Sequence, residues 1–236
     1  MTTNPIVPRV NWATSGTILP FSSPPEGMVS LNVEKRYPTS PMQGFGALRL
    51  RTYRVALPGI DLLPSKIITE WITNFSKFWP KGNHFSTPDG EIRPGVTALI
   101  NLTLPGGVKL YTGAVVMCVG DESFSLITLQ GHMFAGWITF SAYVEDRMLY
   151  AQTQALIRPN DPLYELTFLF GIGPHAEDKF WHASLLNLAR QFGVESRVQQ
   201  VNRTIDRSLQ WRFFGNLWYN AAIRSVLYQL AMPFRK

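Results

Sequence analysis

The residues best suited to chemistry surround a glycine–histidine pair, Gly131-His132, in the middle of an apolar region. Histidine can donate or accept a proton near neutral pH, so His132 is a candidate acid, base or partner for a ligand oxygen. The pair also fits a turn between two strands, where Gly131 can adopt a positive φ at little cost. We favour the turn, with half of the imidazole in water, and keep His132 as the first functional candidate.

Arg158 is the second candidate, because it ends an apolar segment and precedes Pro159-Asn160-Asp161. Its guanidinium could pair with a carboxylate of the protein, with Asp161 as the expected partner, or hold a ligand carboxylate in a bidentate pair. The structural ion pair is the favoured interpretation. No metal site or cofactor is expected, because Cys118 is the single cysteine and the four histidines are scattered.

The composition indicates a folded domain with a sizeable core, since 45% of the residues are hydrophobic and 16% are charged. One cysteine excludes an internal disulfide framework and suits a reducing compartment. The first residues, MTTNPIVPRVNW, lack the basic start and apolar run of a secretory signal. A cytoplasmic location is therefore expected.

Three segments are expected to organise the chain. Residues 1–46 contain seven prolines and predict an extended arm that lies on the surface of the domain. Residues 47–195 are expected to form that domain, and 196–236 a basic amphipathic helix. Within the domain, period-two alternation predicts a strand at 47–57, and helical spacing predicts a helix at 65–79 with Ser65 as its N-cap.

A run of strands follows this helix. The predicted strands are 95–104, 108–118, 124–130, 135–144 and 147–158. Their short connections favour an antiparallel meander, because parallel neighbours need long crossovers. A final helix, 174–192, starts near Pro174, carries Glu177 and Asp178 at its positive end, and presents one apolar stripe.

This order predicts an α+β fold in which a curved antiparallel sheet is covered by the long helix. A hydrophobic cavity is expected between the two. The residues expected to line it are Tyr111, Gln130, His132, Trp137, Phe140, Arg158, Trp181, Leu185 and Leu188.

Two short motifs resemble an uncharacterised branch of the START-like (SRPBCC) superfamily. They are Thr128-Leu129-Gln130-Gly131-His132 followed by Gly136, and Ile157-Arg158-Pro159. The resemblance covers roughly residues 47–193 and implies the helix-grip fold of polyketide cyclases, lipid-transfer domains and plant hormone receptors. That branch has acidic residues where this chain has Trp137 and Ile138, so no role for those acids carries over.

Residues 196–236 hold seven basic residues and one acid, so the whole net charge of +6 lies there. Polar residues recur every four positions from Thr204 to Arg224, which predicts one polar stripe on a helix. The helix could pack on its own domain, join an oligomer, or lie on an anionic membrane surface. The residues expected to make the membrane or partner contact are Arg212, Phe213, Phe214, Leu217, Trp218 and Arg224.

The resemblance and the expected cavity favour a protein that binds or carries a hydrophobic small molecule, such as a lipid, isoprenoid, pigment or polyketide, with peripheral membrane association as an option. A cyclase or isomerase that uses His132 and Arg158 is the alternative from another class. A structural subunit that docks on a membrane complex through 196–236 is the third. No nucleic-acid partner is expected, because the basic residues are interleaved with Leu and Phe.

Overall fold

The computed structural model describes residues 24, 25 and 27–231. Its main element is one eight-stranded antiparallel sheet in the order β2-β3-β4-β5-β6-β7-β1-β8. The strands are β1 (Leu48–Ala56), β2 (His84–Ser86), β3 (Thr97–Thr103), β4 (Lys109–Val119), β5 (Ser123–Thr128), β6 (Phe134–Glu145), β7 (Met148–Pro159) and β8 (Val198–Asp206). The α-helices are α1 (Pro64–Thr73), α2 (Pro162–Leu169), α3 (Ile172–Gln191) and α4 (Ala221–Ala231). Short 3₁₀ segments are η1 (Pro41–Gln43), η2 (Phe75–Phe78), η3 (Pro105–Gly107) and η4 (Trp211–Tyr219).

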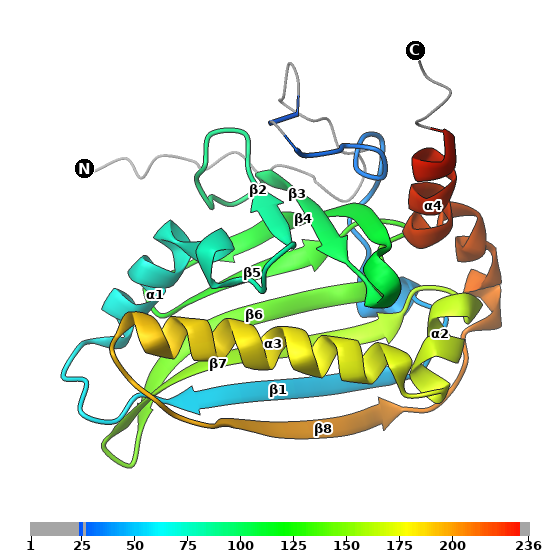
Figure 1. Ribbon diagram of the computed structural model, residues 1–236. Helices are drawn as coiled ribbons and strands as arrows, with labels where there is room; N and C mark the ends of the chain where they lie inside the picture. The colour runs from blue at the N-terminus through cyan, green and yellow to red at the C-terminus, as the bar shows by residue number, and fades with distance from the viewer. Residues whose placement is uncertain (1–23, 26, 232–236) are drawn as a thin grey trace, which may run out of the picture.

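The sheet curves around α3, which crosses its concave face as the long helix of Figure 1. Leu185 and Leu188 of α3 are fully buried in the main core, together with Trp71 of α1 and Phe124 and Phe140 of the sheet. These aromatic rings pack edge to face or stacked, a geometry that aromatic pairs prefer. The predicted α+β, helix-grip arrangement is confirmed.

The predicted meander corresponds to β3–β7, and its hairpins explain the register. Between β6 and β7, Asp146 and Arg147 have φ of 48° and 63°, so both central residues of the turn lie in the left-handed region. Such two-residue turns match the twist of antiparallel neighbours. Twelve register pairs follow, from Glu145↔Met148 to Phe134↔Pro159.

Three local expectations need correction. The helix predicted at 65–79 begins at Pro64 after Leu63, not after a Ser65 cap, and after Thr73 the chain continues as η2. The strand β2 and the helix α2 were not expected. α2 starts because Asp161 accepts hydrogen bonds from the amides of Leu163 and Tyr164, at 2.9 and 3.1 Å.

The predicted single helix over 196–236 is wrong in its first half. Residues Val198–Asp206 form β8, which pairs antiparallel with β1 from Val198↔Val55 to Asp206↔Leu48. A C-terminal helix is present, but it is α4 and is only 11 residues long. No helix among the described residues has the length and hydropathy needed to cross a bilayer.

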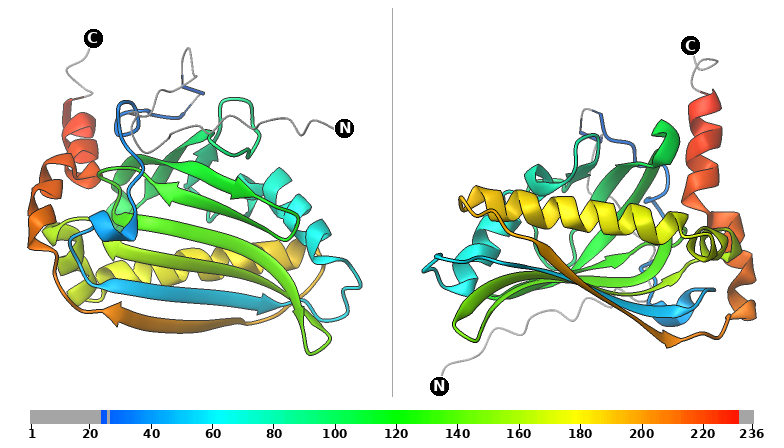
Figure 2. Two further views of the ribbon diagram at one scale, coloured as in Figure 1. Left: turned by 180° about the vertical axis from the view of Figure 1, so that it is seen from behind. Right: turned by 60° about the horizontal axis from the view of Figure 1, so that its bottom comes forward.

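The last three of the polar residues spaced four apart in the tail, Asn216, Asn220 and Arg224, contact the domain, whereas Thr204, Ser208 and Arg212 are exposed. Asn216 donates to the carbonyl oxygens of Gln43 and Asn160, both at 2.9 Å. Arg224 Nε donates to Asn32 Oδ1 at 2.8 Å, and Asn32 Nδ2 donates to the Tyr111 carbonyl oxygen at 2.7 Å. Residues 207–231 therefore pack on their own domain, as Figure 2 shows from behind.

The predicted arm is described only in part, because residues 1–23 and 26 lie outside the described residues. The section 27–46, which we call the strap, follows the surface of the sheet. Thr39 N–H donates to the Thr128 carbonyl at 2.8 Å, and Gln130 N–H donates to the Tyr37 carbonyl at the same distance. Asn32 and Val33 are buried, and Asn32 donates to the carbonyl oxygens of Tyr111 in β4 and Ala221 in α4, so the strap links the sheet to α4.

Candidate functional site: a cavity between the sheet and α3

A cavity of about 250 Å³ lies between the sheet and α3. Most of its wall is apolar and comes from four parts of the fold: Trp79 just after η2, strands β3–β7, α2, and the first half of α3. The aromatic residues among its lining are Trp79, Phe134, Trp137, Phe140, Tyr164, Phe168, Phe180 and Trp181. The charged or readily ionised groups among it are few, chiefly His132 and Glu177.

Four of the nine residues expected to line the cavity do so, namely His132, Trp137, Phe140 and Trp181. Leu185 and Leu188 belong to the packed core. Tyr111 lies under α4, where its amide donates to Ser225 Oγ at 3.0 Å and its ring contacts Tyr228. The other two expected residues, Gln130 and Arg158, lie outside the lining as well.

His132 is buried, with 8% of its surface exposed, so the expected half-exposed turn histidine is wrong in its environment. Its Nδ1 accepts a hydrogen bond from the Phe134 amide at 3.0 Å, which places the proton of the neutral ring on Nε2. Burial lowers the pKa of His132 to about 4. The imidazole is therefore neutral at pH 7.

The C-terminal segment packs against the turn that carries His132. Gly131 has φ of 90° and its carbonyl accepts from the Ala221 amide at 2.9 Å. A Cβ at Gly131 would lie 2.0 Å from the carbonyl oxygen of Tyr219. Glycine is thus needed at position 131 for two reasons: the positive φ of the turn and the close approach of the tail.

His132→Asn should remove part of the loss of stability on acidification. Unfolded histidine titrates near pH 6.5, so below that pH the unfolded state takes up a proton that the folded state refuses. In the wild type this group should reduce the free energy of unfolding by roughly 2 kcal/mol between pH 7 and pH 5. Asparagine keeps an acceptor near the Phe134 amide without the titration, and urea unfolding at both pH values measures the difference.

Glu177, discussed below, acts in the opposite direction in both proteins, so only the difference between variant and wild type reports on His132. An identical pH dependence in the two proteins would contradict the burial of a neutral imidazole.

Arg158 is buried and joins separate segments of the chain, and it does not line the cavity. Its Nη1 donates to the carbonyl oxygens of Gly46 and Ser208, at 2.6 and 2.9 Å, and its Nη2 pairs with Asp206. The expected partner, Asp161, is wrong, because that carboxylate caps α2 and accepts from Asn220 Nδ2 at 2.8 Å. His132 and Arg158 therefore do not converge on the cavity.

A buried group of charged side chains at the wall of the cavity was not predicted from the sequence. Arg51 has only 2% of its surface exposed and lies on the face of β1 that α3 covers. Its Nη1 donates to Glu177 at 2.8 Å, and its Nη2 pairs with Asp178. The hydroxyl of Tyr53 donates to the same Asp178 carboxylate at 2.8 Å.

Burial raises the pKa of Glu177 to about 7, although the neighbouring Arg51 guanidinium acts to lower it. α3 begins at Ile172, so Glu177 and Asp178 lie beyond its first turn and pair with Arg51 instead of stabilising the helix end. One sequence pattern points to this group. Arg51 occupies the same face of its strand as Tyr53 and Val55, where a cation needs a buried partner.

No protein-family model and no curated protein matches this chain. Several solved structures resemble it at low identity. A Mycobacterium smegmatis protein, Ms6760, is 14% identical over 61% of this chain and 90% of its own, with a TM-score of 0.44. Ara h 8.0201 is 10% identical over 60% of this chain and 97% of its own, with a TM-score of 0.43. The di-domain ARO/CYC StfQ of the steffimycin biosynthetic pathway is 13% identical over 62% of this chain and 53% of its own, with a TM-score of 0.41.

The order of the strands and the long helix across the concave face of the sheet define the fold. Within the described residues, no group of three or more His, Cys, Asp or Glu side chains could hold a metal ion.

Proposed function

We propose that the protein binds one small apolar or amphipathic molecule in the cavity between the sheet and α3. The observation that carries the proposal is a cavity whose wall is mostly aromatic and aliphatic and also includes Glu177. Binding sites for small molecules commonly combine an apolar wall with a few polar groups that fix the orientation of the ligand.

The volume limits the size of the ligand. A dry apolar cavity of about 150 Å³ is enough to bind benzene, and this one measures about 250 Å³. A molecule with one or two rings, or a short branched chain, therefore fits without rearrangement. A two-chain lipid does not, so we narrow the range of ligands to small isoprenoid-like, aromatic or polyketide-like compounds.

Polar groups at the wall suggest how such a ligand is oriented. Glu177 can accept a hydrogen bond from a ligand hydroxyl or amine, because Arg51 keeps its carboxyl group fixed. The indole N–H of Trp79, another cavity residue, is buried and has no acceptor among the described residues. An unpaired buried donor costs free energy, and a ligand oxygen would relieve that cost.

We also propose that the chain is related to the START-like branch with the Thr-Leu-x-Gly-His turn. The turn supplies His132 to the cavity wall and Gly131 to the contact with the tail. The cyclase or isomerase alternative gains no support from Arg158, because both terminal nitrogens of its guanidinium bind protein partners outside the cavity. Binding is therefore the function that we propose.

Ala155→Phe should weaken binding of 2-naphthol by at least about tenfold, because the new ring would occupy the space that the ligand needs. Ala155 is buried and lines the cavity on β7. The measurement is a fluorescence titration of the full chain with 2-naphthol, repeated with 2-methylnaphthalene, which has a similar size but no hydroxyl. We expect saturable binding at one site, with the hydroxyl compound bound more tightly.

Val144→Phe is the matched control, since it adds the same ring at an exposed position of β6. This variant should bind as the wild type does. Equal binding by both variants would place the probe on the surface and overturn the proposal, as would no binding by the wild type. Near-ultraviolet circular dichroism verifies that Ala155→Phe is folded.

A further inference from the structure

Exposed apolar side chains gather at the end of the molecule where α2, η4 and α4 meet, at the right of Figure 1. Trp218 is 82% exposed and Phe170 is 76% exposed, which is unusual for residues of this size. We call this the apolar end surface and define it by six residues. They are Leu169, Phe170, Trp211, Trp218, Leu227 and Leu230. Large exposed apolar patches mark surfaces that bind something.

The three segments are held together as one platform. The Ala222 amide donates to the Tyr164 hydroxyl at 3.1 Å, which ties α4 to α2. Asn220 Nδ2 donates to Asp161 Oδ2 at 2.8 Å, and both residues are fully buried. The apolar end surface is therefore presented by a fixed part of the fold and not by a loose tail.

The charges around this surface are almost all positive. Residues 207–231 contain Arg207, Arg212 and Arg224 and no acid. In α2 the acid is Glu165, which is buried in a bidentate pair with Arg49 at 2.9 and 3.0 Å.

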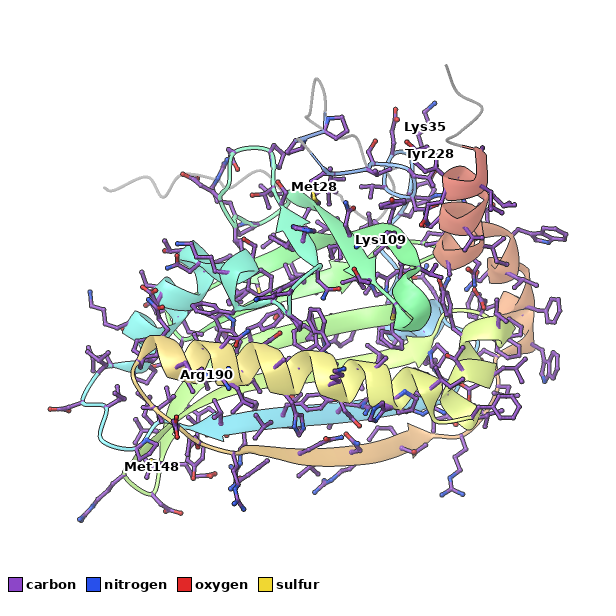
Figure 3. The ribbon with its side chains drawn as sticks, viewed as in Figure 1. Met28, Lys35, Lys109, Met148, Arg190 and Tyr228 are labelled. Atoms are coloured by element: carbon purple, nitrogen blue, oxygen red, sulfur yellow. The ribbon has the colours of Figure 1, made fainter. Side chains whose placement is uncertain are left out.

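The strap adds further cations beside α4. Figure 3 labels Lys35 next to Tyr228 of α4, and the guanidinium of Arg36 stands 4.9 Å from the ring centre of Tyr219. Glu34, the exposed acid of this stretch, precedes these two cations. Positive charges thus frame the exposed aromatic and aliphatic residues.

We propose that the apolar end surface docks the protein on an anionic lipid surface. Protruding apolar side chains enter the boundary between headgroups and acyl chains, tryptophan favours that depth, and the arginines meet anionic headgroups. A protein partner would need a surface matched to side chains from three separate segments, whereas a fluid lipid interface adapts to them. The inference goes beyond ligand binding and does not depend on what fills the cavity.

The test is co-sedimentation of the full chain with vesicles of phosphatidylcholine alone and of phosphatidylcholine with about a third phosphatidylserine, at low and high salt. We expect binding to the anionic vesicles that weakens as salt screens the charges. Phe170→Ser with Trp218→Ser should weaken it by at least about tenfold. Arg212→Glu should weaken it by about tenfold or more, because one cation becomes an anion.

Arg212 suits this change because it is exposed and its guanidinium lies over the neighbouring Phe213 ring, whereas Arg224 is bound to Asn32. Val144→Ser with Val201→Ser is the matched control, as both valines are exposed outside the apolar end surface. Val144 lies in β6 near the turn that Met148 marks in Figure 3, at the opposite end of the molecule.

Several outcomes would overturn the proposal. Full-length protein that stays in the supernatant with every vesicle excludes lipid docking. Equal binding to neutral and anionic vesicles excludes the role of the arginines. Self-association that Phe170→Ser with Trp218→Ser abolishes, without vesicle binding, would assign the surface to a second copy of the chain. Because 2-naphthol binding of the same variants is measured separately, failure here is distinct from failure of the proposed ligand site.

Discussion

Arg51→Met should lower the free energy of unfolding by about 3–5 kcal/mol, because it would leave Glu177 buried without its cation. Arg51 and Glu177 are 2% and 8% exposed, and they are joined by a hydrogen bond of 2.8 Å. Asp178 would lose the same partner but would keep its bonds to Tyr53 and Gln200. Urea unfolding at pH 8, where Glu177 is mostly ionised, should show the largest loss.

A second substitution separates the loss of the pair from the loss of packing. Arg51→Met together with Glu177→Leu should recover much of the stability, since apolar residues of similar volume often replace a buried ion pair without loss. Arg54→Met is the matched control on the same strand, because Arg54 pairs at the surface with Glu145 and should cost less than about 1 kcal/mol. Equal losses for Arg51→Met and Arg54→Met would show that the buried pair is not structurally important.

Leu188→Ala should cost about 2–5 kcal/mol, as expected for deletion of a fully buried leucine side chain. Leu188 lies on the face of α3 that packs into the main core with Leu185 and Ala189. Leu186→Ala is the control, since Leu186 has the same type and helix but remains partly exposed.

Thermal and urea unfolding of both leucine variants measure the difference. If Leu188→Ala lost no more stability than Leu186→Ala, α3 would not cover the sheet, and both the helix-grip arrangement and the cavity would be excluded.

The sequence was most informative where local pattern and tertiary structure agree. Strands β3–β7 follow from alternation and from glycine-containing or acidic turns, because each strand pairs with its neighbour in the chain. The helix α3 follows from its apolar stripe and from Gly193 after its end. The short strand β2 gives too few residues for a pattern, and the sequence signal for α2 is short, an Asp161 N-cap followed by Pro162.

The tail was misinterpreted because partners far away in the sequence decide its structure. Residues 198–206 contain Val198, Val201, Thr204 and Ile205, all of which favour strands, but only pairing with β1 turns that preference into β8. The four-residue spacing of Asn216, Asn220 and Arg224 reflects contacts with three different parts of the domain.

The candidate site was predicted in part for the same reason. The aromatic lining could be expected from apolar strands facing a helix, and Trp137, Phe140 and Trp181 do line the cavity. The polar end of the cavity could not be predicted, since the contact between Arg51 and Glu177 depends on how α3 is placed across β1. The position of His132 at the cavity was anticipated, but the packing of its turn against a tail about 90 residues later in the chain was not.

The position of β1 has a consequence for the protein as it leaves the ribosome. Of the described strands, β1 is the first to be made, yet it lies between β7 and β8, which are the last two. At 5–20 residues per second, β1 waits on the order of ten seconds for its partners. During that time both of its edges are open to other nascent chains, so the protein should depend on chaperones that shield unpaired strands. A message cut short before β8 would yield a chain whose β1 keeps one edge permanently open.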